Sequence, residues 1–186
     1  MHIYAIRHTS VSVPAGICYG KTDVALSESF EEELKQYKNI LPSSVDRVYS
    51  SPLSRCRTLA SGLSADYTTD LRLSELDFGD WELMPWDQIP PEEINPWYKD
   101  IVNIPPKNGE KFLDMFNRVQ HFMTELRQEH HENVLIISHA GVIRCFWAIL
   151  LQIPLENAFR IPVNYGDLLS FHLGKTTEED YITRKQ

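Results

Sequence analysis

Two short apolar runs, far apart in the chain, each end at a histidine. Residues 2–6 read His-Ile-Tyr-Ala-Ile and lead into Arg7-His8, and residues 133–138 read Asn-Val-Leu-Ile-Ile-Ser and lead into His139. Short runs of this kind are typical of buried strands. In α/β proteins the ligand binds at the carboxyl ends of the parallel strands. We therefore expect both histidines to lie at that edge of a sheet.

Helical patterns alternate with the strands. Residues 29–41 place apolar side chains on one face, and Ser29 with Glu32 predicts a capping box at its start. Ser51 and Pro52 are expected to open a second helix as its N-cap and first residue. Further strands are expected at 45–50 and 167–173, and further helices at 110–129 and 140–151. This alternation predicts an α/β fold, a three-layer α/β/α sandwich with a mostly parallel sheet.

One segment departs from the alternation. Residues 83–108 are rich in proline and also hold several tryptophan and tyrosine residues, which predicts an irregular excursion with short helical pieces, placed over the site as a lid. No linker, internal repeat or low-complexity tract divides the chain. We therefore expect a single domain over residues 1–186, long enough to bury a substantial core.

Charge and cysteine content narrow the partners and the location. The net charge of −8 disfavours nucleic acid, because binding to a phosphate backbone depends on surfaces rich in Lys and Arg. The apolar run near Ile143–Leu151 is interrupted by Arg144 and is far too short to cross a membrane. There is no signal-peptide pattern, and the three widely spaced cysteines are typical of reduced thiols. The sequence predicts a cytoplasmic protein without nucleic-acid or membrane partners.

Four short segments contain the residue types that phosphoryl transfer requires. They are Arg7-His8, Ser51–Arg55, Leu73–Glu75 and Ser138–Gly141. A transferring phosphoryl group needs a nucleophile, positive charge around its oxygens and a proton for the leaving oxygen. A neutral imidazole, paired arginine N–H donors and a protonated carboxyl group meet these needs. Each segment alone has an ordinary structural explanation, but together they predict a phosphoryl-transfer site.

These motifs resemble the histidine phosphatase superfamily, whose members have a phosphoglycerate mutase-like fold. The resemblance extends from residue 3 to about residue 173. It rests on Arg7-His8, on Ser-Pro-Leu-x-Arg-Cys within 51–60, on Leu-x-Glu-x-x-x-Gly-x-Trp-Glu at 73–82, and on Ser-His-Ala-Gly at 138–141.

The resemblance implies a role for each motif residue. His8 is implied as the nucleophile that carries the phosphate, Glu75 as the proton donor, and His139 as the second histidine of the phosphate pocket. Glu82 is the rival carboxylate for Glu75. The implied phosphate ligands are Arg7, Arg55 and His139, and backbone N–H groups at Ala140 would add to them if a helix starts there.

Within the superfamily, Arg-His-Thr-Ser together with residues 16–26 looks most like α-ribazole phosphatases of cobalamin synthesis. The implied reaction removes the 5′-phosphate of α-ribazole phosphate or of the phosphorylated cobalamin precursor. A flat benzimidazole favours aromatic walls, for which Trp86 and Trp97 are further candidates, although such residues equally pack an excursion against a sheet. Thr9 stands where the family usually has glycine, and its hydroxyl is free to contact substrate. The predicted substrate contacts are Thr9, Tyr19, Lys21, Trp81 and Glu82.

Other functions stay open at this stage. A phosphoglycerate mutase or a broad sugar-phosphate phosphatase would use the same motifs, but residues 76–106 contain no arginine and only Lys99 as a cation, which disfavours a doubly anionic phosphoglycerate. An inactive phosphate-binding module is the alternative from another class. No metal-ligand spacing is present, so we expect no metal and no cofactor. The expected partner is a small phosphomonoester, and a homodimer is left open.

Overall fold

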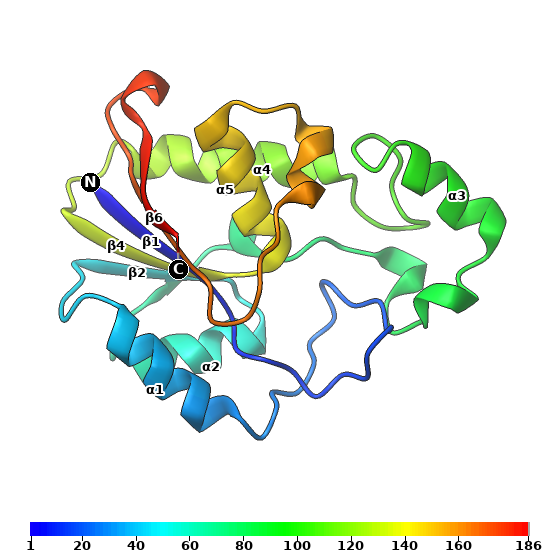
Figure 1. Ribbon diagram of the computed structural model, residues 1–186, viewed down its shortest axis with the longest axis horizontal. Coiled ribbons are helices and arrows are strands. Elements are labelled where there is room, and N and C mark those ends of the chain that lie inside the picture. The colour runs from blue at the N-terminus through cyan, green and yellow to red at the C-terminus, as the bar shows by residue number, and fades with distance from the viewer. Residues whose placement is uncertain (186) are drawn as a thin grey trace.

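The fold is built on one six-stranded sheet with the strand order β3-β2-β4-β1-β5-β6 (Figure 1). The computed structural model describes residues 1–185, so Gln186, the last residue of the predicted domain, lies outside the described residues. β1, β2, β3 and β4 run parallel to one another, whereas β5 is antiparallel to both of its neighbours. The predicted mostly parallel sheet is therefore confirmed. The strands are β1 (His2–Arg7), β2 (Arg47–Ser50), β3 (Thr68–Thr69), β4 (Asn133–Ser138), β5 (Leu168–His172) and β6 (Tyr181–Lys185).

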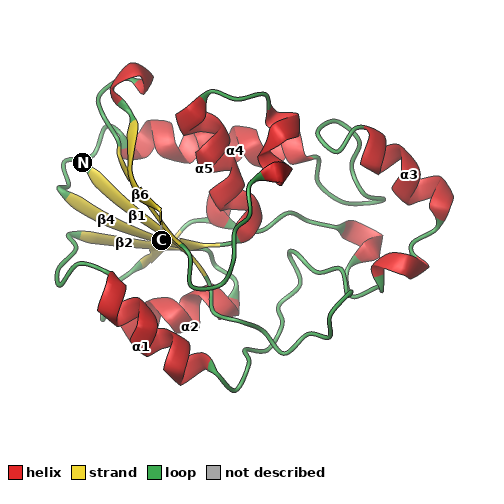
Figure 2. Cartoon of the chain, in the orientation of Figure 1, coloured by secondary structure: helices red, strands yellow, loops and turns green. Residues whose placement is uncertain are grey.

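Helices cover both faces of the sheet, which confirms the predicted three layers (Figure 2). α1 (Phe30–Ile40) and α2 (Ser54–Leu63) lie on one face, and α4 (Phe112–Leu126) and α5 (Ala140–Leu151) lie on the other. The alternation of side chains along each strand explains this: Ile3 of β1 packs into the cluster beneath α4 and α5, and Ile6 packs into the cluster beneath α1 and α2. Buried apolar area on both faces fixes the position of β1 in the middle of the molecule.

One predicted cap and one predicted helix start are wrong. Ser29 is the N-cap residue of α1, as expected, but it forms no capping box: its hydroxyl makes no bond to the backbone and instead donates to the carboxylate of Glu33 at 2.6 Å. Helix α2 begins at Ser54 with Leu53 as its N-cap, not at Ser51-Pro52. Ser51 is displaced from the helix because its hydroxyl pairs with His139 at 2.7 Å.

The remaining differences lie at the ends of elements and at the sheet edges. The helix expected over 110–129 is α4, which is shorter at both ends. Its start is later because the backbone of Lys111 is extended, and it ends at Leu126. Strands β3 and β6 form the two edges of the sheet and were not predicted, because β3 has only two residues and β6 is largely polar. Among residues 1–185, no helix combines the length and apolar character needed to cross a membrane.

The excursion at 83–108 is partly helical and has a small core of its own. It contains α3 (Pro91–Lys99), which begins with a proline at a position where helices tolerate it. Trp81, Trp97 and Ile94 pack there with Cys18. Cys18 is also joined to the excursion by two backbone hydrogen bonds of 2.8 Å, one to Met84 and one from the amide of Leu83. The loop that follows β1 and the excursion are therefore held as one unit.

Candidate active site

His8 lies directly after β1, at the carboxyl edge of the sheet. Parallel pairing of β1 with β4 sets Arg7 opposite Ser138, so the residues that follow the two strands, His8 and His139, become neighbours. The two imidazole rings are in edge-to-face contact with centroids 5.1 Å apart. The predicted meeting of the two histidines at one strand edge is thus confirmed.

The surroundings of His8 fix which of its ring nitrogens is free. Nδ1 lies 2.7 Å from the carbonyl oxygen of Thr9, which can only accept a hydrogen bond, so Nδ1 carries the proton. Nε2 is then left with a lone pair, toward which the Nε–H of Arg55 points at 3.3 Å. Burial, followed by the charges of Arg55 and Arg7, holds the pKa of His8 well below the usual 6.5. The result is a neutral imidazole with an available lone pair, as nucleophilic attack on phosphorus requires.

Two arginines beside His8 carry charges that no carboxylate neutralises among the described residues. Arg55 is fully buried, and its terminal nitrogens donate to the carbonyls of Gly20 and Thr22. Arg7 donates to the carbonyl of Val163 at 2.9 Å and lies 3.8 Å above the ring of Tyr165, while its buried Nε has no hydrogen-bond partner. Buried charge of this kind is costly unless an anion completes it. The pair therefore forms an anion pocket around His8.

His139 is completely buried behind His8. One ring nitrogen, Nε2, lies 2.7 Å from the hydroxyl of Ser51 and 3.5 Å from the thiol of Cys56. Burial, and then the neighbouring His8 and Arg55, lower its pKa well below 6.5. These surroundings favour the neutral form of His139.

Glu75 faces the same pocket from the loop after β3. Its carboxylate accepts N–H bonds from Leu76 at 3.0 Å and from Gly141 at 3.2 Å. The first turn of α5 therefore donates to Glu75 through the N–H of Gly141. The phosphate contact expected of the Ala140 N–H stays a prediction. Gly141 permits this approach because any Cβ there would lie 2.2 Å from Oε1 of Glu75.

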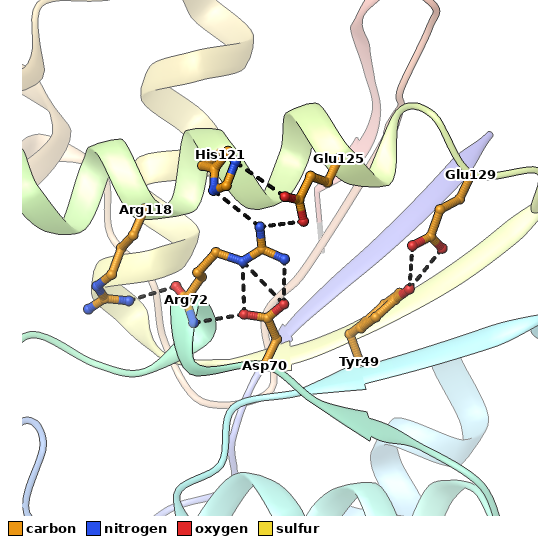
Figure 3. A network of polar contacts seen from close by, with 7 residues as sticks. All are labelled: Tyr49, Asp70, Arg72, Arg118, His121, Glu125 and Glu129. Atoms are coloured by element: carbon orange, nitrogen blue, oxygen red, sulfur yellow. Dashed lines mark hydrogen bonds and ion pairs between the residues drawn. The ribbon is translucent and has the colours of Figure 1, made fainter.

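The loop that carries Glu75 is attached to α4 by a polar network (Figure 3). Arg118 donates to the carbonyl oxygens of Arg72, Ser74 and Glu75. Arg72 in turn pairs with Asp70 and, at 2.6 Å, with Glu125 of α4. Because Asp70 follows β3 and Glu125 belongs to α4, this network fixes the backbone of Glu75 between sheet and helix.

A cavity of about 190 Å³ is lined by Arg7, His8 and Glu75. Arg55 and His139 do not line it but contact His8. Its walls are largely aromatic. The remaining lining residues are Ile17, Tyr19, Leu76, Phe78, Trp86, Phe112, Gly141, Arg144 and Phe159.

Three of the predicted substrate contacts do not line the cavity. Trp81 is 1% exposed and its indole N–H bonds to Glu93, because it belongs to the core of the excursion. Glu82 accepts backbone N–H bonds from Gly20, Lys21, Thr22 and Phe78, so its carboxylate holds two loops together. Lys21 is exposed and pairs with Asp77 outside the cavity.

The other two predicted contacts lie close to His8. Tyr19 lines the cavity, and its hydroxyl meets that of Tyr165 at 2.8 Å. Thr9 is fully buried, and its hydroxyl has no hydrogen-bond partner. An unpartnered buried hydroxyl one residue from His8 is consistent with a group that acquires its partner from a ligand. Among residues 1–185 no group of metal-ligating side chains suited to an ion is present.

Comparison with known proteins agrees with this geometry. A family model for the histidine phosphatase superfamily (branch 1) matches residues 3–179. The chain belongs to this superfamily. The histidine phosphatase described here is therefore an enzyme that hydrolyses phosphate esters.

Several relatives of this histidine phosphatase have names that state a substrate. The adenosylcobalamin/α-ribazole phosphatase of Salmonella typhimurium is 30% identical, over 89% of this chain and 87% of its own. Phosphoserine phosphatase 1 of Hydrogenobacter thermophilus is 28% identical, over 81% and 76%. The crystal structure of the α-ribazole phosphatase from Shigella flexneri superposes with a TM-score of 0.89 at 26% identity, covering 98% of this chain and 95% of that one.

Two residues of this histidine phosphatase site were not predicted from the sequence as site residues. Arg144 lines the cavity from α5, where its Nε–H donates to the carbonyl of Ile161 at 3.1 Å. Tyr165 contacts Arg7 and also packs against His8, with ring centroids 5.6 Å apart. In the sequence, Arg144 cannot be told apart from a polar interruption of an apolar helix. No sequence pattern marks Tyr165.

Proposed function

We propose that this histidine phosphatase removes the 5′-phosphate from α-ribazole phosphate, or from the phosphorylated cobalamin precursor, through a phosphate carried on His8. The observation that carries the proposal is one cavity that is lined both by His8, Arg7 and Glu75 and by aromatic side chains. The same space thus offers polar groups for a phosphate and apolar surface for a flat leaving group.

The proposed chemistry has two steps. In the first, Nε2 of His8 attacks phosphorus, the ester P–O bond breaks, and the leaving oxygen takes a proton from Glu75. In the second, water attacks phosphorus and gives a proton to Glu75, the P–N bond to Nε2 of His8 breaks and returns the lone pair to that nitrogen, and inorganic phosphate leaves. Arg7 and Arg55 stabilise the equatorial oxygens in both steps, and His139 donates to one of them once the pocket carries negative charge.

Two observations support the choice of substrate. Relatives that cover most of this chain include adenosylcobalamin/α-ribazole phosphatases of Escherichia coli and Salmonella typhimurium. In addition, Tyr19 of the first loop and Trp86 of the excursion both line the cavity. Aromatic surface of this kind suits a planar benzimidazole.

A second candidate substrate is O-phosphoserine, and Arg144 is the observation that favours it. Its guanidinium lines the cavity, stacks on Phe159 at 5.6 Å, and has no carboxylate partner among the described residues. A phosphoserine carboxylate would neutralise it, whereas a ribose would only accept hydrogen bonds from it. Phosphoserine phosphatase 1 of Hydrogenobacter thermophilus is among the relatives.

Phosphate release from α-ribazole 5′-phosphate, O-phosphoserine, 3-phosphoglycerate and p-nitrophenyl phosphate by wild type and Arg144→Met tests the proposal. A highest kcat/KM for α-ribazole 5′-phosphate supports it. A highest value for O-phosphoserine, lost selectively in Arg144→Met, replaces it with the second candidate. Equal values for all four esters would indicate a broad phosphatase.

Three further properties stay predictions. A cytoplasmic location follows from the cysteine pattern, and fractionation of cells that express the chain tests it. Residues 83–108 are proposed to act as a lid, and hydrogen exchange with and without inorganic phosphate tests that. The oligomeric state is open between monomer and homodimer, and sedimentation equilibrium decides it.

A further inference from the structure

Both polar groups of the peptide unit between Thr9 and Ser10 are hydrogen-bonded to side chains. Its carbonyl oxygen, on Thr9, takes the Nδ1–H of His8 at 2.7 Å. Its N–H, on Ser10, donates to Oε2 of Glu33 at 2.8 Å. The C=O and N–H of a trans peptide point in opposite directions within one rigid plane. A group that fixes the N–H therefore also fixes the direction of the carbonyl that orients His8.

Glu33 is built to hold that peptide. Its other oxygen, Oε1, accepts the hydroxyl of Ser29 at 2.6 Å and, in a shorter contact, the hydroxyl of Ser10. Burial on its own would raise the pKa of Glu33, but the Ser10 and Ser29 hydroxyls and the Ser10 N–H lower it overall. The ionised carboxylate is thus favoured, with hydrogen bonds to both oxygens and no ion pair to a cation among the described residues.

The support of Glu33 is itself rigid. α1 is anchored in the core by Leu34 and Tyr37, the two residues of that helix that are fully buried. The hydroxyl of Tyr37 also donates to the carbonyl of Arg7 at 2.6 Å. One helix therefore holds the backbone on both sides of His8. The side chain of Thr9 does not contribute, because its hydroxyl has no partner.

We propose that Glu33 is a positioning residue for His8, acting through the Thr9–Ser10 peptide to keep Nδ1 protonated and Nε2 aimed at phosphorus. The inference rests on the proposed role of His8 as nucleophile. Glu33 touches neither the cavity nor the substrate, so its removal is expected to slow the chemical step and leave substrate binding intact. A misplacement of about 1 Å at a reacting atom costs about 10²-fold in rate.

The test compares Glu33→Ala and Glu33→Gln with Glu32→Ala, a matched control that removes the neighbouring, exposed carboxylate of the same helix. The substrate is p-nitrophenyl phosphate, whose leaving group needs no proton, so that only the attack by His8 is followed. Glu33→Ala is expected to lower the rate of phosphoenzyme formation about 10-fold to 100-fold, with KM within about twofold of wild type. Glu33→Gln keeps an oxygen for the Ser10 N–H and is expected to retain most of the rate, and Glu32→Ala to retain all of it.

A second readout does not depend on activity. Nitrogen NMR of labelled histidine, with the His8 signal assigned from a His8→Asn variant, reports which ring nitrogen carries the proton. A single Nδ1–H form in wild type that becomes a mixture in Glu33→Ala supports the proposal. The burst amplitude counts the active molecules, so the rate can be expressed per folded molecule. If both this rate and the His8 signal are unchanged in Glu33→Ala, the proposal is overturned and Glu33 is a purely structural residue. Phosphoenzyme on His8→Asn would instead refute the proposed function while leaving the NMR result for Glu33 standing.

Discussion

Replacing Gly141 with alanine places a methyl group against the proposed proton donor. The new Cβ would lie 2.2 Å from Oε1 of Glu75 and 2.8 Å from Cε of Met115, both far ends of flexible side chains. Because a normal contact between carbon and oxygen is about 3.3 Å, the carboxylate has to move by about 1 Å. The backbone is not crowded, and alanine is a better helix former than glycine, so the stability of α5 is expected to change little.

A shift of about 1 Å at a reacting group costs about 10²-fold in rate, which corresponds to about 2.7 kcal/mol in the activation free energy. In phosphoenzyme formation, which kcat/KM reports, the loss is expected only where the leaving group needs the proton of Glu75. Gly141→Ala is therefore expected to lower kcat/KM about 100-fold for an alkyl phosphate such as α-ribazole 5′-phosphate and to leave kcat/KM for p-nitrophenyl phosphate nearly unaffected. The later attack of water, in which Glu75 takes the proton, is the same for both esters and affects kcat alone.

The assay is phosphate release from both esters by wild type, Gly141→Ala and Gly62→Ala. Gly62 is a matched control because it lies in α2, where a Cβ would lie 2.8 Å from a side-chain carbon of Leu34 and far from any carboxylate of the site. An equal loss on both esters would refute the reasoning, since it would show that the methyl group disturbs the pocket as a whole. A full rate on both would remove Glu75 from the role of proton donor.

Four other outcomes are expected. His8→Ala abolishes the acid-labile phosphoenzyme, measured by quench and filter binding with radiolabelled substrate; label on that variant would place the nucleophile elsewhere. Arg55→Ala is expected to raise KM and lower kcat together, because the proposed contact of its buried guanidinium with phosphate is made in both the ground and the transition state; an unchanged kcat/KM contradicts this. Trp86→Leu lowers kcat/KM more for α-ribazole 5′-phosphate than for p-nitrophenyl phosphate, and equal losses would assign Trp86 to packing against Phe78. Burial and the two arginines lower the pKa of His8, so Nε2 stays unprotonated as the pH falls. We therefore expect kcat/KM for p-nitrophenyl phosphate to stay level from about pH 7 to about pH 5.5. An inflection of kcat/KM near pH 6.5 would contradict the lowered pKa of His8.

The convergence of the inner site was predictable because it depends on strand ends. Once residues 2–6 and 133–138 are buried parallel strands, His8 and His139 have to emerge at the same edge, and the structure pairs them in that way. The short segments with Arg55 and Glu75 follow β2 and β3 and reach this edge for the same reason.

The outer site was not predictable, because side-chain packing decides it. Glu75 and Glu82 are two carboxylates of one motif, and only the fold shows that backbone N–H groups of two loops surround Glu82. A tryptophan such as Trp81 is typical of the wall of a ligand site. In the fold, however, Trp81 packs beside Trp97 in the core of the excursion, and no periodic pattern in the sequence predicts that core. Arg144 is indistinguishable in sequence from a break in an apolar helix until α5 is seen to border the cavity.

β1 precedes the other strands in the sequence, yet both of its partners come much later. It lies inside the sheet between β4 and β5, and Arg7 contacts Val163 and Tyr165. The segment with Arg7 and His8 therefore has no neighbour in the sheet until residues 133–138 are present, and its second neighbour is added only with residues 168–172. A polypeptide that stops before β4 contains Arg7 and His8 but has no strand to hold them in place.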